Sequence, residues 1–299
     1  MRPSLVALAC ALPLAAQALA PAPAAPQRAD RAKEAAAFAA SLAREGDDYR
    51  AIGEYKRALF LDPASPEAIG WQLAIGEAYR AGGQYEEAGK QFDALAQAGT
   101  AGRAAAKLGA AKSWLSARRY GRAAARAKSA AQAYAGDAQK VREAEYLEGW
   151  ALVRAGRDGE AAQAFAAARG PGKVGEGAQR LVLVMPQLQH LPSKSPVLAG
   201  VLGLVPGLGH LYLGDPGTAV SALVWNGVFG WALYEAVAAK SWSLAVVLGM
   251  FEAMWYGGSI VGSISGAHRF NRDARVNAME ELEKIAPPAL VDDVQGRKD

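Results

Sequence analysis

The sequence has little of what catalytic and metal sites are made of. It holds three histidines and a single cysteine, Cys10, among 299 residues. A structural zinc site needs four ligands that are mostly cysteine and histidine, and a disulfide needs two cysteines. The sequence shows no Ser/His/Asp or Cys/His grouping and no paired carboxylates in a catalytic setting. We therefore expect a protein that is not an enzyme and that holds no metal or cofactor.

A strong excess of one charge is also missing. The formal net charge is +4, which is too small on a chain of this length to indicate nucleic-acid binding. The charge is unevenly distributed, because almost all of it precedes Lys194 and the longest apolar segments follow it. The chain is long enough for two domains, and this change in composition predicts two of different character.

The N-terminal residues 1–20 have the pattern of a secretory signal peptide. Arg2 gives a positive start, an apolar core follows, and small residues offer a cleavage site. An uncleaved anchor is one alternative, and a lipoprotein signal is another, although Cys10 comes too early for it. Residues 21–29 form an Ala/Pro linker. Export of the following segment from the cytoplasm is the expected consequence.

Residues 30–169 are rich in alanine and carry helical periodicity that is broken at regular intervals. Four alanines in similar contexts recur about every 35–38 residues: Ala51, Ala88, Ala123 and Ala161. Small residues allow paired helices to approach, and Tyr, Phe and Trp fill the gaps between them. This pattern resembles the tetratricopeptide repeat family, a helix–turn–helix unit of about 34 residues. A generic α-solenoid is the alternative, because the intervals are longer than usual.

The resemblance implies that an inner groove of the solenoid binds a protein partner. The groove would be lined by the first helix of each pair, where we expect Trp71 and Gln72 to contact the partner. Tyr79 and Trp114 lie on the same helices, and for these two we favour a packing role.

A basic stretch gives a second candidate surface. Arg118, Arg122 and Arg126 are spaced four apart, which predicts one stripe along a helix. The stripe is either a solvated face or a contact for anionic lipid headgroups or an acidic partner.

Residues 170–194 are expected to be a linker followed by a short apolar docking helix over Gln179–Leu191. The glycines of the segment 170–177 do not form a phosphate-binding loop, because the Gly-Lys-Ser/Thr ending and a preceding strand are both absent from the sequence.

Residues 195–272 have the composition of a membrane module. Thr218–Ala239 and Trp242–Ala267 are each long and apolar enough to span a bilayer. Ser195–Leu213 is also apolar but is interrupted by a Pro-Gly break, which predicts a broken or re-entrant helix covered by other protein. The alternative is that this segment crosses as a third span. Residues 273–299 are expected to be a polar C-terminal tail.

A motif at the start of this module carries a second resemblance. Its pattern is Pro-Gly-x-Gly-His-x-Tyr-x-Gly, followed by an asparagine in the next apolar segment: Pro206, Gly207, Gly209, His210, Tyr212, Gly214 and Asn226. It is similar to a small bacterial two-span (TM-two-like) membrane module, a resemblance that implies membrane insertion and no particular activity. We expect the glycines to allow sharp turns and Tyr212 to lie at the membrane interface.

Polar and small residues inside the predicted spans suggest how the module packs. Asn226 and Glu252 would be costly in a bilayer unless they are paired. We expect them to hydrogen-bond to each other or to backbone freed at Pro206, with an ion contact as the alternative. The small-residue stripe of Gly258, Gly262 and Gly266 either closes the module's own hairpin or forms a face between copies in a homo-oligomer.

Together these patterns predict an all-α protein: an α-solenoid of helix–turn–helix repeats followed by a helical transmembrane hairpin with a broken or re-entrant helix. The predicted function is a membrane-tethered interaction scaffold of the bacterial cell envelope that assists envelope or membrane-protein assembly. It would lie in the inner membrane with its repeats in the periplasm and would bind a protein partner and the lipid bilayer, without nucleic acid. The alternative is a small channel or transport component built by oligomerisation, with Asn226 and Glu252 facing the pore.

Overall fold

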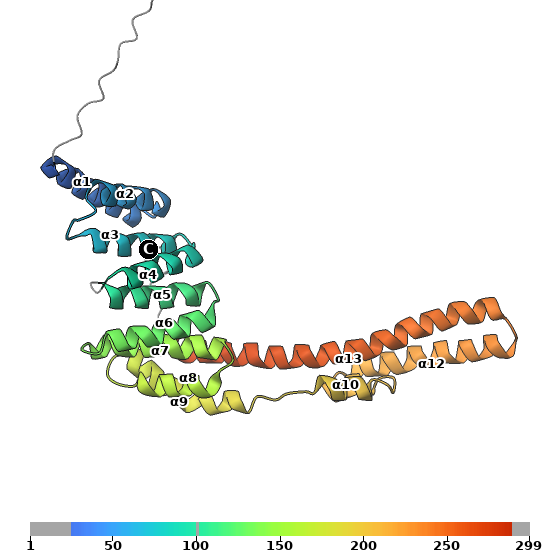
Figure 1. Ribbon diagram of the computed structural model, residues 1–299. Helices are drawn as coiled ribbons and strands as arrows, with labels where there is room; N and C mark the ends of the chain where they lie inside the picture. The colour runs from blue at the N-terminus through green and yellow to red at the C-terminus, as the bar shows by residue number, and fades with distance from the viewer. Residues whose placement is uncertain (1–24, 100–101, 289–299) are drawn as a thin grey trace, which may run out of the picture.

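The computed structural model describes residues 25–99 and 102–288, and these are all-helical with no strand. The predicted signal peptide lies outside the described residues. Within the described residues, nine helices precede the predicted membrane module (Figure 1): α1 (Ala25–Arg44), α2 (Asp48–Leu61), α3 (Ala68–Ala81), α4 (Tyr85–Ala98), α5 (Arg103–Ser116), α6 (Tyr120–Ala133), α7 (Ala138–Arg154), α8 (Asp158–Ala167) and α9 (Lys173–Gln189). Four more follow: α10 (Pro196–Leu202), α11 (Leu208–Leu213), α12 (Pro216–Ala238) and α13 (Trp242–Ile285).

Two predicted linkers are shorter than expected. The Ala/Pro linker was expected to reach residue 29, but α1 already begins at Ala25. Pro26 lies in its first turn, where proline is tolerated because the amide there has no partner within the helix. Helix α9 likewise begins at Lys173, inside the segment expected to be a glycine-rich linker, and its capping residue Gly172 has a positive φ of 91°.

Helix starts and ends follow local chemistry. Asp47 and Asp137 precede α2 and α7, and their carboxylates accept hydrogen bonds from backbone amides of the first turn. Gly156 follows α7 with φ of 78°, a left-handed conformation that glycine adopts without strain. Such signals make each repeat a pair of helices with a tight turn between them.

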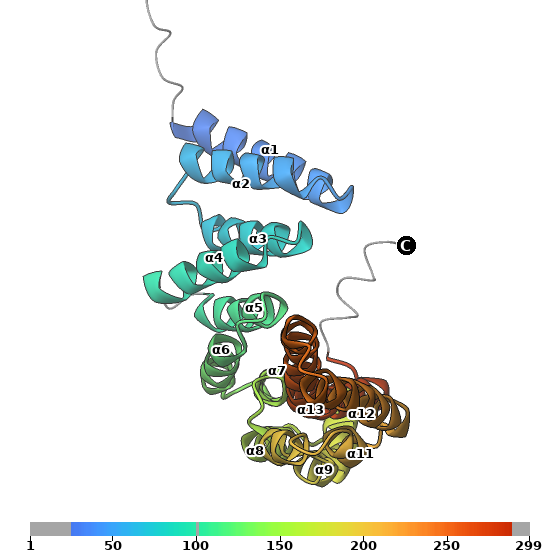
Figure 2. The same cartoon turned by 90° about the vertical axis from the view of Figure 1, so that its right-hand side faces the viewer.

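The helices α1 to α8 stack in chain order as a solenoid (Figures 1 and 2). The four alanines that define the predicted repeat fall on α2, α4, α6 and α8, and each is at most 1% exposed. This arrangement confirms the predicted register of helix pairs, with the second helix of each pair presenting the same buried alanine.

Large rings pack directly on glycine backbone between neighbouring helices. Phe92 of α4 is 1% exposed and lies between Gly76 of α3 and Gly109 of α5, where an added Cβ would approach its ring to 2.5 and 2.7 Å. Phe165 of α8 covers Gly149 of α7 in the same way, at 2.6 Å. The expected pairing of small and aromatic residues is therefore confirmed. It packs the two helices of a repeat together, and the contact of Phe92 with Gly109 also joins one repeat to the next.

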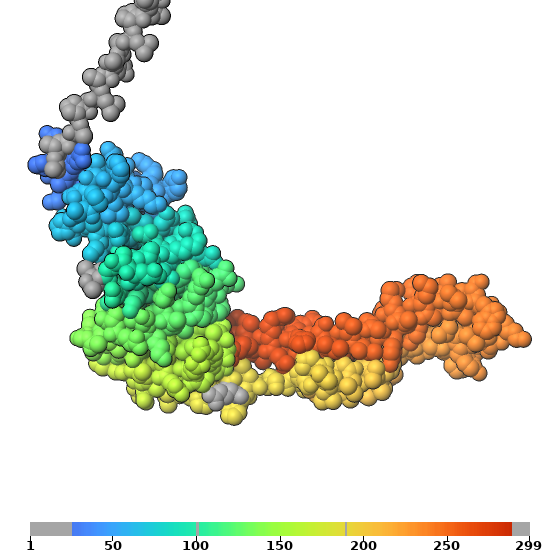
Figure 3. Space-filling view, in the orientation of Figure 1, coloured from blue at the N-terminus to red at the C-terminus, as the bar shows by residue number. Residues whose placement is uncertain are grey.

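The long helix α13 connects the two parts of the molecule. Its 44 residues extend about 66 Å at 1.5 Å per residue. The C-terminal part packs against α9 and is joined to α7 by side-chain hydrogen bonds. The N-terminal part leaves the solenoid and pairs with α12 in an antiparallel hairpin. The molecule is consequently L-shaped, with a solenoid arm and a hairpin arm (Figures 1 and 3).

Side chains fasten the end of α13 to the solenoid. Arg275 donates to both carboxylate oxygens of Asp158, at 2.5 and 2.7 Å, and Arg154 pairs with Glu283 at 2.6 Å. The hydroxyl of Tyr146 lies 2.8–2.9 Å from main-chain oxygens just beyond α13. We call these contacts the α13 latch. The prediction of a polar tail beginning at residue 273 is therefore wrong for residues 273–288, since amphipathic α13 continues into the solenoid core.

The segment Ser195–Leu213 forms two short helices that double back. α10 runs alongside α13 toward the hairpin tip, where Gly203 approaches Ile260. After the turn, α11 returns, with His210 beside Gly262 and Leu213 beside Gly266. With seven and six residues, these helices are about 10 Å long, so the alternative in which this segment crosses as a third span does not fit the structure.

Candidate functional site

The predicted motif residues of the membrane module come together at the base of the hairpin arm. Gly207 has φ of 86°, and a Cβ at this position would meet the carbonyl oxygen of Ala219 on α12. Gly209 is buried, and a Cβ there would meet the hydroxyl of Ser263 on α13. The glycines thus allow α11 to fit between two long helices, which supports their expected structural role.

Side-chain hydrogen bonds at this base hold the backbone just before α10. Asn271 of α13 accepts from the amide of Lys194 at 2.7 Å and donates to its carbonyl at 2.8 Å. The Tyr212 hydroxyl accepts from the amide of Ser195 at 3.0 Å, and the Lys194 ammonium lies 4.7 Å from the centre of the Tyr212 ring. Tyr212 therefore holds the entry into α10. Sequence reasoning named Tyr212 but missed Lys194, whose role depends on a partner 77 residues away.

A backbone carbonyl beside the break at Pro206 accepts a side-chain hydrogen bond that the sequence did not reveal. Tyr256 of α13 donates its hydroxyl hydrogen to the carbonyl oxygen of Leu204 at 2.6 Å. At the other end of α11, Gly214 has φ of 84° and Asp215 caps α12. Hydrogen bonds from the Thr218 side chain and amide lower the pKa of Asp215 below its ordinary value of 3.8, so this carboxylate is charged at neutral pH.

The small-residue stripe packs within the chain, but against α11. A Cβ on Gly266 would approach Leu213 to 2.5 Å, and one on Gly262 would lie 3.4 Å from the His210 ring. Gly258 faces open space, with nothing within 4 Å. Of the two alternatives, packing inside the module is the one observed for Gly262 and Gly266, although their partner is α11 and not α12.

Asn226 and Glu252 do not pair, so the hydrogen bonds predicted for them are wrong. The Asn226 amide nitrogen donates to the Ala222 carbonyl of its own helix at 2.6 Å. Its Oδ1 is buried without a hydrogen-bond partner, as is Oε2 of Glu252. Helix geometry explains the hydrogen bond of Asn226, because an asparagine side chain reaches the carbonyl four residues earlier in its own helix more readily than a group on the next helix.

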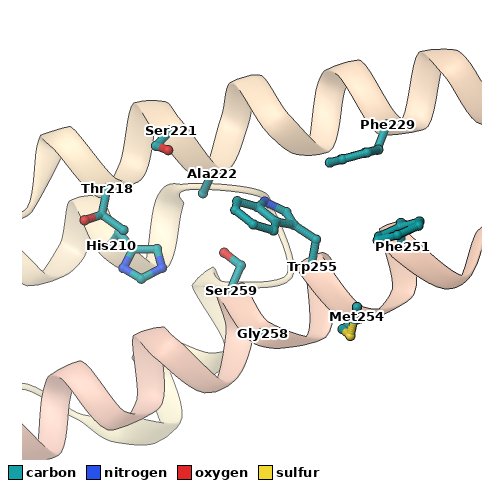
Figure 4. Close-up of a pocket in the computed structure, with 10 residues that line it drawn as sticks. All are labelled: His210, Thr218, Ser221, Ala222, Phe229, Phe251, Met254, Trp255, Gly258 and Ser259. Carbon is teal, nitrogen blue, oxygen red and sulfur yellow. The ribbon is translucent and has the colours of Figure 1, made fainter. Parts of the chain in front are cut away.

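A pocket of about 440 Å³ lies between α12 and α13 and is bordered by α11. Figure 4 shows polar side chains at one end, His210, Thr218, Ser221 and Ser259 among them, and Phe229, Phe251, Met254 and Trp255 at the other. The Phe229 and Phe251 rings stack with centroids 6.3 Å apart. His210 of the predicted motif and Gly258 of the small-residue stripe are among the residues that line this pocket.

The residues proposed for the solenoid surface agree with expectation only in part. Trp114 is 2% exposed, which fits the packing role favoured for it. Trp71 is 6% exposed and also belongs to the core, so of the two expected partner contacts only Gln72 is partly exposed. Arg118 lies in the turn before α6 with φ of 58°, which interrupts the predicted stripe. Arg126 pairs with Asp93 at 2.6 Å.

Arg122, the remaining member of the stripe, stacks over the Trp114 ring at 5.0 Å. The three arginines therefore do not form one uniform basic face, because one is off the helix and two have partners within the solenoid.

The hairpin arm exposes an extensive apolar surface. Within the described residues, α13 is the helix long and apolar enough to cross a membrane by length and composition. Large apolar side chains on both hairpin helices are more than half exposed: Val220, Leu223, Trp231, Tyr234, Trp242, Val246, Met250 and Met254. A surface of this kind marks an interaction site for lipid or protein.

In the parts of the chain that the structure describes, no group of three or more His, Cys, Asp or Glu side chains could hold a metal ion. Comparison with known protein families finds no match, and a search of characterised proteins finds none either. The features that indicate a function are therefore the solenoid, the apolar hairpin and the helix α13 that connects them.

Proposed function

We propose that this protein is a membrane-tethered interaction scaffold of the bacterial cell envelope, which holds a partner-binding solenoid at a fixed position on the inner membrane. The observation that carries the proposal is the continuity of α13, which runs from the apolar hairpin into the solenoid core as one helix. A flexible linker would let the solenoid rotate freely, whereas a helix with a side-chain latch fixes it.

The fold gives this scaffold a defined orientation. If the hairpin lies along the membrane normal, the stack of helices in the solenoid runs roughly parallel to the membrane surface (Figure 1). Eight residues separate Ala267, where the apolar part of α13 ends, from Arg275 of the latch, a distance of about 12 Å. The solenoid would thus lie next to the headgroups, with its first repeats farthest from the hairpin.

If the hairpin spans the membrane, the solenoid and the base of the hairpin arm lie on the same side of it. Lys194, Arg269 and Arg272 lie at that base, while Lys240 lies at the tip, so the basic residues favour a cytoplasmic solenoid. The N-terminal segment favours export, and the first apolar segment usually dominates orientation. We therefore place the solenoid in the periplasm and the tip in the cytoplasm.

Cysteine labelling tests this topology. In a chain with Cys10→Ser, we expect Ser241→Cys at the tip to react with a membrane-impermeant maleimide only in inverted membrane vesicles. Gln139→Cys at the exposed start of α7 should react only in spheroplasts. Labelling of both positions from one side would contradict a spanning hairpin, and exchanged sides would contradict a periplasmic solenoid.

A partner site on the first repeats fits this arrangement. A pocket of about 430 Å³ lies between α2 and α3 and reaches Gln84 at the cap of α4. Tyr49, at its rim, is 81% exposed, and Tyr79 accepts a hydrogen bond from Lys56 at 2.9 Å. Tyrosine and arginine dominate binding energy at protein interfaces, and Arg50 also lines the pocket.

Crosslinking in cells tests the scaffold function. We expect Tyr49→Ala to reduce the yield of a specific crosslinked partner of the full chain at least about tenfold, which corresponds to the loss of one binding hot spot. Phe60→Ala is the matched control, since Phe60 is an aromatic of the same helix that is 85% exposed outside the pocket. Recovery of the protein only as its own oligomer, unaffected by Tyr49→Ala, would favour the channel alternative.

A further inference from the structure

The pocket between α12 and α13 has a polar end and an apolar end in a fixed order. The polar end lies beside α11 and the cap of α12, at the base of the hairpin arm, and the aromatic end lies nearer the tip (Figure 4). In the membrane orientation proposed above, the polar end is at the headgroup level and the aromatic end is in the hydrocarbon region. Membrane lipids present their groups in the same order.

One buried polar atom in the wall of this pocket and a second on the helix face beside it lack hydrogen-bond partners. The Ser259 hydroxyl belongs to the pocket wall, and its Oγ is buried with no hydrogen bond. Asn226 is 5% exposed, and its Oδ1 has no hydrogen bond. Asn226 lies on the α12 face between Ala222 and Phe229, which both line the pocket. Because Oδ1 of an amide only accepts, a ligand that satisfies it must offer a hydrogen-bond donor.

The origin of the pocket is a glycine that no helix covers. The two later members of the stripe are covered by α11, but at Gly258 an added Cβ would meet nothing within 4 Å. A volume of about 440 Å³ lies within the range of small-molecule sites, about 300–1,000 Å³. A larger side chain at this position would fill the pocket without displacing the helices.

The charged residues at the base of the hairpin arm indicate which charge the headgroup of the ligand carries. The Lys194 ammonium is held over two rings near the start of α10, and the positive charge of Arg269 acts on Asp215 at the cap of α12. Arg272 is exposed one turn beyond Arg269. Three cations at the base, Lys194, Arg269 and Arg272, stand against the two carboxylates Asp215 and Asp273. The net positive charge favours a negatively charged headgroup.

We propose that this pocket binds one hydroxyl-bearing anionic glycerophospholipid. One acyl chain lies along Phe229, Phe251 and Trp255, and the phosphate faces the basic residues at the base. The headgroup folds back past the phosphate into the pocket, so that one of its hydroxyls donates to the unpartnered Ser259 Oγ. This inference rests on the proposed insertion of the hairpin in a membrane.

Native mass spectrometry of the full chain in detergent, with added phosphatidylglycerol or phosphatidylcholine, tests the proposal. Phosphatidylglycerol has headgroup hydroxyls and a net negative charge, and phosphatidylcholine has neither. We expect one phosphatidylglycerol per chain, bound at least about tenfold more tightly than phosphatidylcholine. Gly258→Leu should reduce this binding about tenfold or more, which is a loss of about 1.4 kcal/mol.

Two further variants make the result specific. Gly257→Leu is the matched control, because its added side chain also meets nothing within 4 Å but lies outside the pocket, and it should bind like the natural chain. Ser259→Ala should reduce the preference for phosphatidylglycerol while the chain still binds lipid.

Equal binding by the Gly258→Leu and Gly257→Leu variants would overturn the proposal. A dimer that Gly258→Leu dissociates would assign the pocket to a second copy and would also overturn it. These outcomes are separate from failure of the proposed function, which would appear as a chain that remains soluble without detergent or that loses no partner in the Tyr49→Ala variant.

Discussion

Replacing Arg275 by alanine is expected to release the solenoid from its fixed position on α13. The guanidinium of Arg275 holds both oxygens of Asp158 and also donates to the Val153 carbonyl at 2.7 Å. The Asp158 side chain is 16% exposed, so removing its partner leaves a largely buried carboxylate uncompensated. Breaking a fully buried pair costs about 3–5 kcal/mol, and we expect about 2–3 kcal/mol here because the pair is partly solvated.

The release can be measured as a distance. With spin labels at Gln139→Cys and Ser241→Cys in a Cys10→Ser chain, the natural sequence should give one narrow distance distribution between solenoid and hairpin tip. Arg275→Ala should broaden it. Arg272→Ala is the matched control, since Arg272 lies one turn earlier, is 69% exposed and approaches only Asp273, at 3.8 Å. A narrow distribution in the Arg275→Ala variant would show that the latch is dispensable for the scaffold.

Replacing Phe92 by alanine is expected to lower the free energy of unfolding by about 3–5 kcal/mol. The ring is buried between glycines of α3 and α5. Its removal therefore leaves a cavity between two successive repeats. Glycine has no side chain that could move into the cavity, and the surrounding helices are held by their other contacts. The cost should therefore lie near the upper end of the range.

Chemical denaturation of the full chain in detergent, followed by circular dichroism, measures this change. Phe60→Ala removes the same ring from an exposed position (85%) and should change the free energy of unfolding by no more than about 0.5 kcal/mol. An equal loss in the two variants would contradict the packing of Phe92 between the glycines.

Local signals in the sequence determined most of the repeat architecture. The periodic alanines predicted four helix pairs in register, and each of these alanines is buried because only a methyl group fits between the closely packed helices. Positions that depend on contacts with another helix were less predictable. Trp71 was expected at a partner surface, but it is buried in the core, since the face of a helix that a neighbour covers depends on how the pairs stack.

The hairpin arm also has features that the sequence predicted and features that only the tertiary structure decided. Apolar length, the Pro-Gly break and the glycine stripe were evident in the sequence by itself, because each depends only on residue type and spacing. The tertiary structure decided that α10 and α11 double back, that the stripe packs on α11, and that Asn226 and Glu252 stay apart. It also decided that the presumed tail continues α13 into the solenoid. The ion pair of Arg275 with Asp158 spans 117 residues, and sequence periodicity carries no information about a contact at that separation.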